Sequence, residues 1–436
     1  MKVYAERRAR LMKRIGYGNI AVVATANVAL RNRDSEYAFR PDSDFYYLTG
    51  FAEPEAVAVF IPGKRAQESR YILFCRERDP LKEVWNGRRA GQEGVLRDYG
   101  ADEAYPIGEL AEKMGQFLEN RQSLYYAVGK EAAFDQQVMS WRARVLEKTR
   151  AGVQAPSQFI AIETIIHEMR LIKDRSEVAL MRQAAQISAQ AHCRAMRLCR
   201  PGMQEFQLEA ELLHEFTRHG SRAPAYNSIV AGGENGCILH YTENSAELKT
   251  GDLLLIDAGC ELGYYASDIT RTFPVNGRFS AAQRALYEVV LAAQHAAIAQ
   301  VKPGKRWHEP HAAAVRVLTA GLLKLGILKG TLTTALKEES YRRFYMHRTG
   351  HWLGMDVHDV GDYRVAGAWR KFEPGMVLTV EPGLYIPPGS RGVAKKWWNI
   401  GIRIEDDLLV TATSHEILTR GVPKSVAEIE ALMAGE

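Results

Sequence analysis

The sequence has few cysteines, no long apolar run and almost no net charge. Its five cysteines among 436 residues are odd in number and form no Cys-x-x-Cys pair, which argues against a disulfide framework or a structural zinc site. The first residues lack the apolar core of a signal peptide, and residues 20–30 are too short and too interrupted to span a bilayer. We therefore expect a soluble, cytoplasmic protein without a membrane partner.

A net charge of +5 is slight for this length, and no basic run with interleaved aromatic residues is present of the kind that nucleic-acid-binding proteins use. We therefore expect a small molecule as the partner, and no nucleic acid. The length exceeds the size at which a single hydrophobic core stops growing, so the chain is expected to form two domains.

The two parts of the chain have different patterns. Residues 1–172 alternate short β-rich runs with helix-compatible stretches, which predicts an α/β domain. A capping box, with Asp174 as N-cap and Glu177 three residues later, predicts the start of a long helix just after this part. We therefore place a second domain at 173–436.

The second domain reads as a duplicated unit. Arg200-Pro-Gly and Lys302-Pro-Gly each separate two helix-like stretches, and each helix pair is followed by an apolar run that begins at a glycine. The first run ends at Asp257 and the second at Glu381, each just before another glycine. This pattern predicts helix, helix and hairpin, repeated once with the hairpins meeting at a common site.

Four carboxylates belong to these hairpins. Asp268 follows Asp257 with Gly263 between them, which suits an antiparallel return strand that brings both acids to one end. Glu405 follows Glu381 after a longer turn. Carboxylates at the ends of apolar runs are costly when unpaired, and four together would repel one another or take up protons. The set, with His351 as a fifth ligand, predicts a site for two divalent metal ions.

Further histidines stand beside these hairpins. His240 lies before the first hairpin, whereas His347, His351 and His358 precede the second, and only one of them has to bind metal. Glycine-rich loops beside a metal site are common places for substrate-binding histidines.

The alternation of side chains along a strand adds candidates that would hydrogen bond to the ligands and hold them in place. Thr270 shares a face with Asp268, and Arg403 shares one with Glu405, whereas Asp406 falls on the opposite face and is assigned no ligand role.

In these sequence segments the chain resembles the pita-bread metallopeptidases, and within them the bacterial aminopeptidase P family most closely. The resemblance rests on the ligand order Asp, Asp, His, Glu, Glu, on the run Pro-Gly375-Met-Val-Leu-Thr-Val-Glu381-Pro-Gly383, and on the duplicated layout. It extends to the N-terminal part through four segments that resemble that family's N-terminal domain: 34–37, 42–51, 85–89 and 167–170. The implied fold is an α/β N-terminal domain followed by an α+β pita-bread catalytic domain with an internal pseudo-twofold repeat.

The resemblance also implies roles for the five ligands. Asp257 would bind one metal, His351 and Glu381 the other, and Asp268 and Glu405 would bridge both. The family site holds two manganese ions with a bridging water or hydroxide, and hard Mn²⁺ suits oxygen-rich ligands with one imidazole.

Other positions match substrate-contacting residues of the family. His240 and His358 match histidines around the scissile bond, and His347 matches one in the pocket for proline. With Glu381 as proton relay, these three are the predicted catalytic residues. The predicted substrate-binding or supporting residues are Tyr385, Arg403, Thr270, Trp85 and Asp34. One departure is Arg348-Thr349-Gly350, where related chains often have a smaller Gly-containing sequence.

The expected activity is release of the N-terminal residue from peptides with proline at the second position, by a homo-oligomer, either a dimer or a tetramer. Three alternatives stay open at this point. Prolidase shares all five ligands and cleaves Xaa-Pro dipeptides. Creatinase-like enzymes and non-catalytic pita-bread modules are expected to lack part of the metal set.

Overall fold

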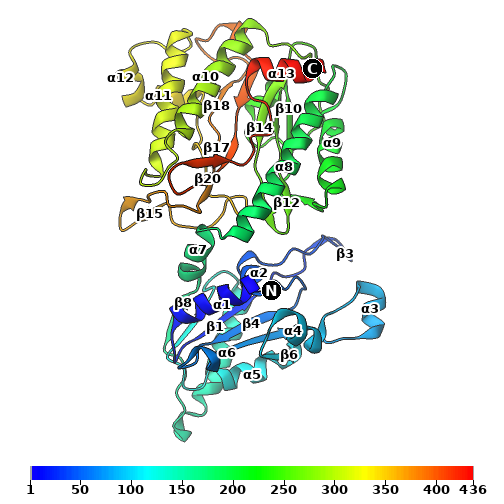
Figure 1. Cartoon of the computed structure of the whole chain (residues 1–436), viewed down its shortest axis with the longest axis vertical. Coiled ribbons are helices and arrows are strands. Elements are labelled where there is room, and N and C mark those ends of the chain that lie inside the picture. Colours follow the sequence, from blue (N-terminus) through cyan, green and yellow to red (C-terminus); the bar gives the residue numbers. More distant parts are fainter. Residues whose placement is uncertain (1, 436) are drawn as a thin grey trace. The chain divides into compact units, whose positions relative to one another are not determined.

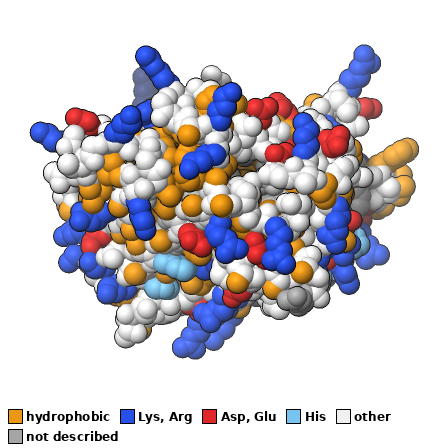
Figure 2. Space-filling view, turned by 90° about the horizontal axis from the view of Figure 1, so that it is seen from above, with side chains coloured by type: hydrophobic (Ala, Val, Ile, Leu, Met, Phe, Trp, Pro, Cys, Tyr) orange, Lys and Arg blue, Asp and Glu red, His pale blue; other side chains and the backbone are white. Residues whose placement is uncertain are grey.

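The structure is a computed structural model that describes residues 2–435, and the chain divides into two compact units, Met1–Arg170 and Leu171–Glu436. Figure 1 shows the helices and strands of both units. None of the described helices combines the length and the apolar composition needed to cross a membrane. Basic and acidic side chains are interspersed over the face seen in Figure 2, with apolar side chains between them.

The first unit is built on one mixed six-stranded sheet with the order β6-β5-β4-β1-β7-β8. Every residue of β4 is buried, which requires cover on both faces of the sheet. Helices α5 and α6 supply one cover through Met114, Val138 and Trp141. The strands are β1 (Ile20–Ala24), β2 (Leu30–Asn32), β3 (Ser35–Glu36), β4 (Val57–Ile61), β5 (Arg70–Cys75), β6 (Glu103–Pro106), β7 (Ser123–Tyr126) and β8 (Gln158–Ala161). The helices are α1 (Lys2–Ile15), α2 (Ser43–Thr49), α3 (Pro80–Asn86), α4 (Gly91–Tyr99), α5 (Leu110–Phe117), α6 (Ala132–Leu146) and α7 (Glu163–Leu171), the last of which crosses the boundary.

The second unit contains the predicted succession of two helices and a hairpin, twice. The first half comprises α8 (Arg175–Leu198), α9 (Glu205–Arg218), β9 (Ala223–Pro224), β10 (Ile229–Gly232), β11 (Leu253–Asp257), β12 (Cys260–Leu262), β13 (Tyr265–Ala266) and β14 (Thr270–Pro274). The second comprises α10 (Ala281–Ile298), α11 (His308–Lys324), α12 (Leu332–Lys337), β15 (Arg364–Val365), β16 (Ala368–Trp369), β17 (Val377–Val380), β18 (Gly383–Ile386), β19 (Ile400–Arg403), β20 (Asp406–Val410) and β21 (His415–Ile417), followed by α13 (Val426–Ala434).

Local signals explain where the first helix of each half begins. The side chain of Asp174 accepts hydrogen bonds from the backbone at the start of α8, and Glu177 bonds back to the Asp174 backbone. Ser280 and Gln283 do the same for α10. The capping box at Asp174 is therefore as predicted from the sequence.

The ligand-bearing strands are paired in the same way in both halves. β11 is antiparallel to β14 with Asp257 opposite Thr270, and β17 is antiparallel to β20 with Val380 opposite Asp406. The two halves are joined where the Glu405 backbone N–H donates to the Thr270 carbonyl at 3.0 Å. This junction brings the ends of both hairpins together in the middle of the unit.

Candidate metal centre

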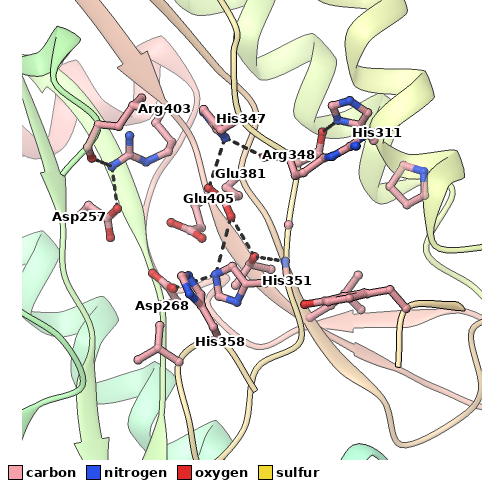
Figure 3. A pocket seen from close by; sticks show the side chains of 18 of the residues that line it. Asp257, Asp268, His311, His347, Arg348, His351, His358, Glu381, Arg403 and Glu405 are labelled. Carbon is pink, nitrogen blue, oxygen red and sulfur yellow. Dashed lines mark hydrogen bonds and ion pairs between the residues drawn. The ribbon is translucent and has the colours of Figure 1, made fainter. Parts of the chain in front are cut away.

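The five predicted ligands line a single cavity of about 1120 Å³ in the second unit (Figure 3). Asp257 is the last residue of β11, and Asp268 precedes β14. Glu381 follows β17, Glu405 precedes β20, and His351 lies in the loop before β15. Strand ends of both halves thus supply the carboxylates, and one loop supplies the imidazole.

His351 is oriented as a ligand through one particular nitrogen. Its Nδ1 lies 3.0 Å from the Trp352 carbonyl, so this nitrogen carries the proton. Nε2 then faces the acids, 3.4 Å from Asp268 Oδ2 and 3.7 Å from Glu381 Oε1. Atoms of Asp268, His351 and Glu405 lie within 4.8 Å of one another, close enough to hold one ion. Because Nδ1 is engaged by the carbonyl, Nε2 is the ring nitrogen that a cation would bind.

The electrostatics of the acids also fit a cation. Burial raises the pKa of Glu381 to about 7, and burial together with the charges of Asp268 and Glu381 raises the pKa of Glu405 well above its usual range. Although burial lowers the pKa of His351, its hydrogen bond to Asp268 and the charge of Glu381 raise it to about 9. These acids resist ionisation, and the imidazole of His351 attracts a proton. Both effects indicate that the site lacks positive charge, which divalent ions would supply.

Asp257 is the exception among the acids, because it has its own cation. Burial opposes its ionisation, but Arg403 donates to Asp257 Oδ2 at 2.6 Å and holds its pKa below the usual value. Arg403 also donates to Tyr385 Oη at 2.9 Å. Arg403 Nε donates to the Thr270 hydroxyl at 3.1 Å, and this hydroxyl in turn donates to Glu405 at 2.6 Å. Arg403, Tyr385 and Thr270 therefore fix ligands rather than bind metal themselves.

His347 is kept neutral by its burial and by the neighbouring Arg403. Its Nδ1 lies 2.7 Å from the Arg348 carbonyl and carries the proton, whereas Nε2 accepts from Tyr385 Oη at 2.8 Å. Burial, with Arg403 nearby, lowers the pKa of His347 to about 3. His347 thus lines the cavity with both ring nitrogens engaged.

His240 and His358 line the same cavity. The ring of His358 lies edge-on to that of His351, with centroids 4.3 Å apart. Burial and the neighbouring His351 lower the pKa of His358.

Two predicted residues lie elsewhere. Asp34 is exposed in the β2–β3 turn of the first unit, and Trp85 on α3 is 87% exposed. Neither is among the residues that line the cavity. Their assignment to substrate binding stays a prediction.

Sequence reasoning missed Tyr226, whose hydroxyl bridges two of the ligands. It lies 2.6 Å from Asp257 Oδ1 and is also hydrogen bonded to Asp268. Burial and these two carboxylates raise the pKa of Tyr226 well above its usual value. Tyr226 lies just before β10, in which Ile229 pairs with Asp257. Recognising β10 as the partner of β11 would have placed this tyrosine near the site.

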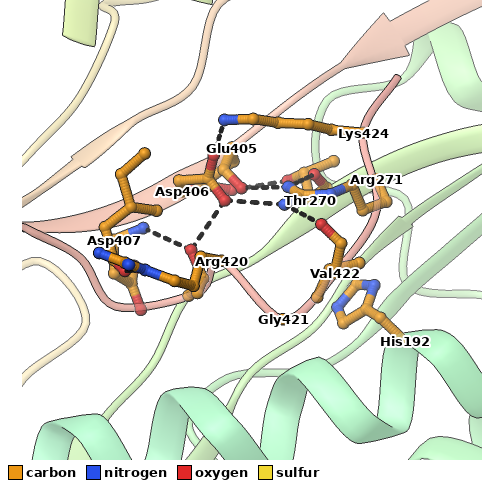
Figure 4. Close-up of polar contacts among 12 residues, drawn as sticks. His192, Thr270, Arg271, Glu405, Asp406, Asp407, Arg420, Gly421, Val422 and Lys424 are labelled. Carbon is orange, nitrogen blue, oxygen red and sulfur yellow. Dashed lines mark hydrogen bonds and ion pairs between the residues drawn. The ribbon is translucent and has the colours of Figure 1, made fainter. Parts of the chain in front are cut away.

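Asp406 has no place in the cavity, in agreement with the parity argument. Its carboxylate lies behind the ligand strands and accepts from Thr419 at 2.8 Å, Gln294 at 2.9 Å and Lys424 at 2.6 Å (Figure 4).

Comparisons with known proteins agree with this architecture. The model of metallopeptidase family M24 matches residues 179–412, and that of the aminopeptidase P N-terminal domain matches residues 4–125. The chain belongs to metallopeptidase family M24. Among curated relatives, the Xaa-Pro aminopeptidase of Escherichia coli K12 is 47% identical over 99% of this chain and 97% of its own length.

Solved structures superpose over nearly the whole chain. Aminopeptidase PepP of Pseudomonas aeruginosa has a TM-score of 0.97 and 56% identity, covering 99% of this chain and 97% of that one. Proline aminopeptidase P II of Yersinia pestis has a TM-score of 0.97 and 49% identity, covering 100% and 99%. The predicted fold, an α/β N-terminal domain followed by a pita-bread catalytic domain, and the predicted enzyme class, a hydrolase, are confirmed.

Proposed function

We propose that this M24 metallopeptidase is an Xaa-Pro aminopeptidase that removes the N-terminal residue from peptides with proline at the second position, using two divalent metal ions. The observation that carries the proposal is the convergence of Asp257, Asp268, His351, Glu381 and Glu405 on one cavity. The curated relatives named Xaa-Pro aminopeptidase support the choice of substrate. Four carboxylates and one imidazole favour Mn²⁺ as the metal.

In this proposal Asp257 would hold one ion, His351 and Glu381 would hold the other, and Asp268 and Glu405 would serve both. Two such ions, when bound, activate a water and polarise the carbonyl that it attacks. Glu381 takes the proton from the attacking water on its carboxylate and passes it to the departing proline nitrogen. Arg403 keeps Asp257 ionised and in place through its 2.6 Å contact.

The histidines of the cavity act on the substrate. His240 and His358 stabilise the negative charge that develops on the carbonyl oxygen. His347, held by Tyr385 with its proton on Nδ1, offers a flat apolar surface for the proline ring. An Xaa-Pro bond has no N–H, so the site has to recognise the residue by the shape of its ring.

The dimensions of the cavity favour an aminopeptidase over prolidase. The cavity has a volume of about 1120 Å³. It extends past the ligands to α11 and the β15–β16 hairpin, with Trp307 and Trp369 among its walls. A substrate therefore has room beyond the proline, which a dipeptide does not use.

The test is a hydrolysis panel on protein reconstituted with Mn²⁺, using Ala-Pro-Ala, Ala-Ala-Ala and Ala-Pro. We expect Ala-Pro-Ala to be cleaved about 10- to 200-fold faster than Ala-Ala-Ala, the range that pocket shape alone supplies. Comparable rates on these two would refute proline specificity. Cleavage of Ala-Pro without cleavage of Ala-Pro-Ala would identify a prolidase.

The proposal includes a cytoplasmic homo-oligomer, a dimer or a tetramer, acting on peptides. This part rests on the family resemblance of the sequence. Light scattering of the purified protein measures the oligomeric state directly.

A further inference from the structure

Beyond His347, the wall of the cavity carries a hydrogen-bonded relay of Thr349, Tyr345 and His311, none of which is among the predicted site residues. Thr349 is 3% exposed, and its hydroxyl lies 2.6 Å from Tyr345 Oη and 2.7 Å from His311 Nδ1. The Thr349 carbonyl accepts from the Glu381 backbone N–H at 2.8 Å. One residue, Thr349, thus connects helix α11 directly to the candidate proton relay.

The relay fixes the tautomer of His311. Tyr345 is 1% exposed, and within residues 2–435 its hydroxyl has Thr349 as its one hydrogen-bond partner. A buried hydroxyl proton has to be accepted, so Tyr345 donates to Thr349. Thr349 then donates its own proton to His311 Nδ1, and His311 carries its proton on Nε2. Burial and the charge of Arg348 lower the pKa of His311 to about 4, which keeps the ring neutral.

The relay leaves His311 with a fixed N–H donor in a cavity wall. His311 lines the cavity, and the Nε2–H donor has no acceptor within the described part of the chain. Arg348 lines the same region and lies close enough to His311 to affect its pKa. Figure 3 shows the two side chains at the same end of the cavity.

Arg348 has a charge that nothing nearby neutralises. It is exposed to the cavity, and its guanidinium forms neither a hydrogen bond nor an ion pair with any residue in 2–435. Arginine binds carboxylates through two parallel hydrogen bonds, and charge-assisted bonds of this kind are about twice as strong as neutral ones. A guanidinium beside a fixed neutral donor suits a carboxylate better than a backbone carbonyl.

We propose that His311 and Arg348 form a subsite for the free C-terminal carboxylate of a tripeptide, Xaa-Pro-Yaa. The inference rests on the proposed function and adds a preferred substrate class. An extended chain spans about 3.3–3.6 Å per residue, so the carboxylate of the third residue lies roughly 7 Å beyond the scissile bond. Thr349 alone links His311 to Glu381. Its hydroxyl is hydrogen bonded to His311 Nδ1 at 2.7 Å, and its carbonyl accepts from the Glu381 backbone N–H at 2.8 Å.

The test compares kcat/KM on Ala-Pro-Ala with that on its C-terminal amide, Ala-Pro-Ala-NH₂. The amide keeps the proline and the third residue and removes the carboxylate charge. We expect the wild-type enzyme to prefer the free acid by roughly 10-fold or more, the effect of one hydrogen bond to a charged group. Arg348→Gln should bring this ratio close to one.

Two further variants separate binding from structural support. Asn in place of His311 can still accept from Thr349 but has no donor at the position of Nε2, whereas Gln places a donor there. His311→Asn should therefore lose most of the preference, and His311→Gln should keep more of it. Arg278→Gln is the charge control, because Arg278 is exposed, pairs with Glu430 and does not line the cavity. It should keep the wild-type ratio.

The possible failures are distinct. Equal wild-type rates on acid and amide would refute the subsite and leave the proposed function intact. Equal losses on both substrates in Arg348→Gln and His311→Asn would give these residues a structural role only and overturn the inference. Cleavage of neither peptide would refute the proposed function, and the subsite with it.

Discussion

Arg271 and Asp406 form an ion pair of 2.7 Å in which both side chains are only 1% exposed (Figure 4). The same arginine donates to the backbone carbonyls of Thr270 and Glu405, one from each half of the catalytic unit. The pair therefore lies directly behind the junction that positions the ligand strands.

Asp406→Asn should destabilise the protein, because removing one charge of a buried pair leaves the other without compensation. The expected cost is about 3–5 kcal/mol in the free energy of unfolding, measured by chemical denaturation of the metal-free protein. Glu416→Gln is the control, since Glu416 also pairs with an arginine at 2.7 Å but the partners are 29% and 48% exposed. The free energy of unfolding of Glu416→Gln should fall by less than about 1 kcal/mol. Equal effects of the two changes would contradict the assigned role of burial.

Asp257→Asn and Glu381→Gln should each remove nearly all activity while the protein stays folded with a reduced metal content. Each change removes a charge that balances the ions, and the second also removes the proton relay. Activity, circular dichroism and metal analysis of the same samples check this. A variant that keeps more than about a tenth of wild-type turnover would show that its residue is not essential.

His240→Ala and His358→Ala should bind metal almost normally and lose transition-state stabilisation, so kcat should fall more than KM rises. Steady-state kinetics on Ala-Pro-Ala together with metal analysis measures both effects. His214 on α9 is exposed and does not line the cavity, so His214→Ala serves as the control. Metal loss in proportion to activity would make either cavity histidine a ligand.

Stability should fall between pH 6.5 and 4 in a way that depends on His192. This residue is fully buried beside the Ala258 carbonyl at 2.9 Å, and burial lowers its pKa to about 4. Because the unfolded chain binds the proton near pH 6.5 and the folded chain does not, falling pH favours unfolding over this window. The contribution is about 3 kcal/mol, complete above pH 6.5 and lost by pH 4.

His192→Gln keeps a donor and removes the titration. Denaturation at pH 7.5, 6, 5 and 4 should therefore show a smaller loss of stability in the variant than in the wild type. Parallel pH curves for the two proteins would mean that His192 titrates alike in the folded and unfolded states.

The sequence alone determined the parts of the protein that depend on local pattern. Apolar runs ending in an acid predicted the strand ends at Asp257 and Glu381, and a capping box predicted the start of α8. These signals are readable because strand alternation and helix capping act between residues a few positions apart. The spacing of the acids also sufficed to predict a dinuclear site, because their charges require compensation.

Only the tertiary structure decided which distant residues support those ligands. Tyr226 is 42 residues from Asp268, and His311 is 38 residues from Thr349, yet each pair is hydrogen bonded. Nothing in the local sequence distinguishes these side chains from ordinary loop or helix residues. The direction in which α11 presents His311 depends on how that helix packs across the core, and packing is a property of the whole fold. The sequence thus determined the chemistry of the candidate metal centre, whereas long-range packing determined which residues orient its side chains and shape the rest of the cavity.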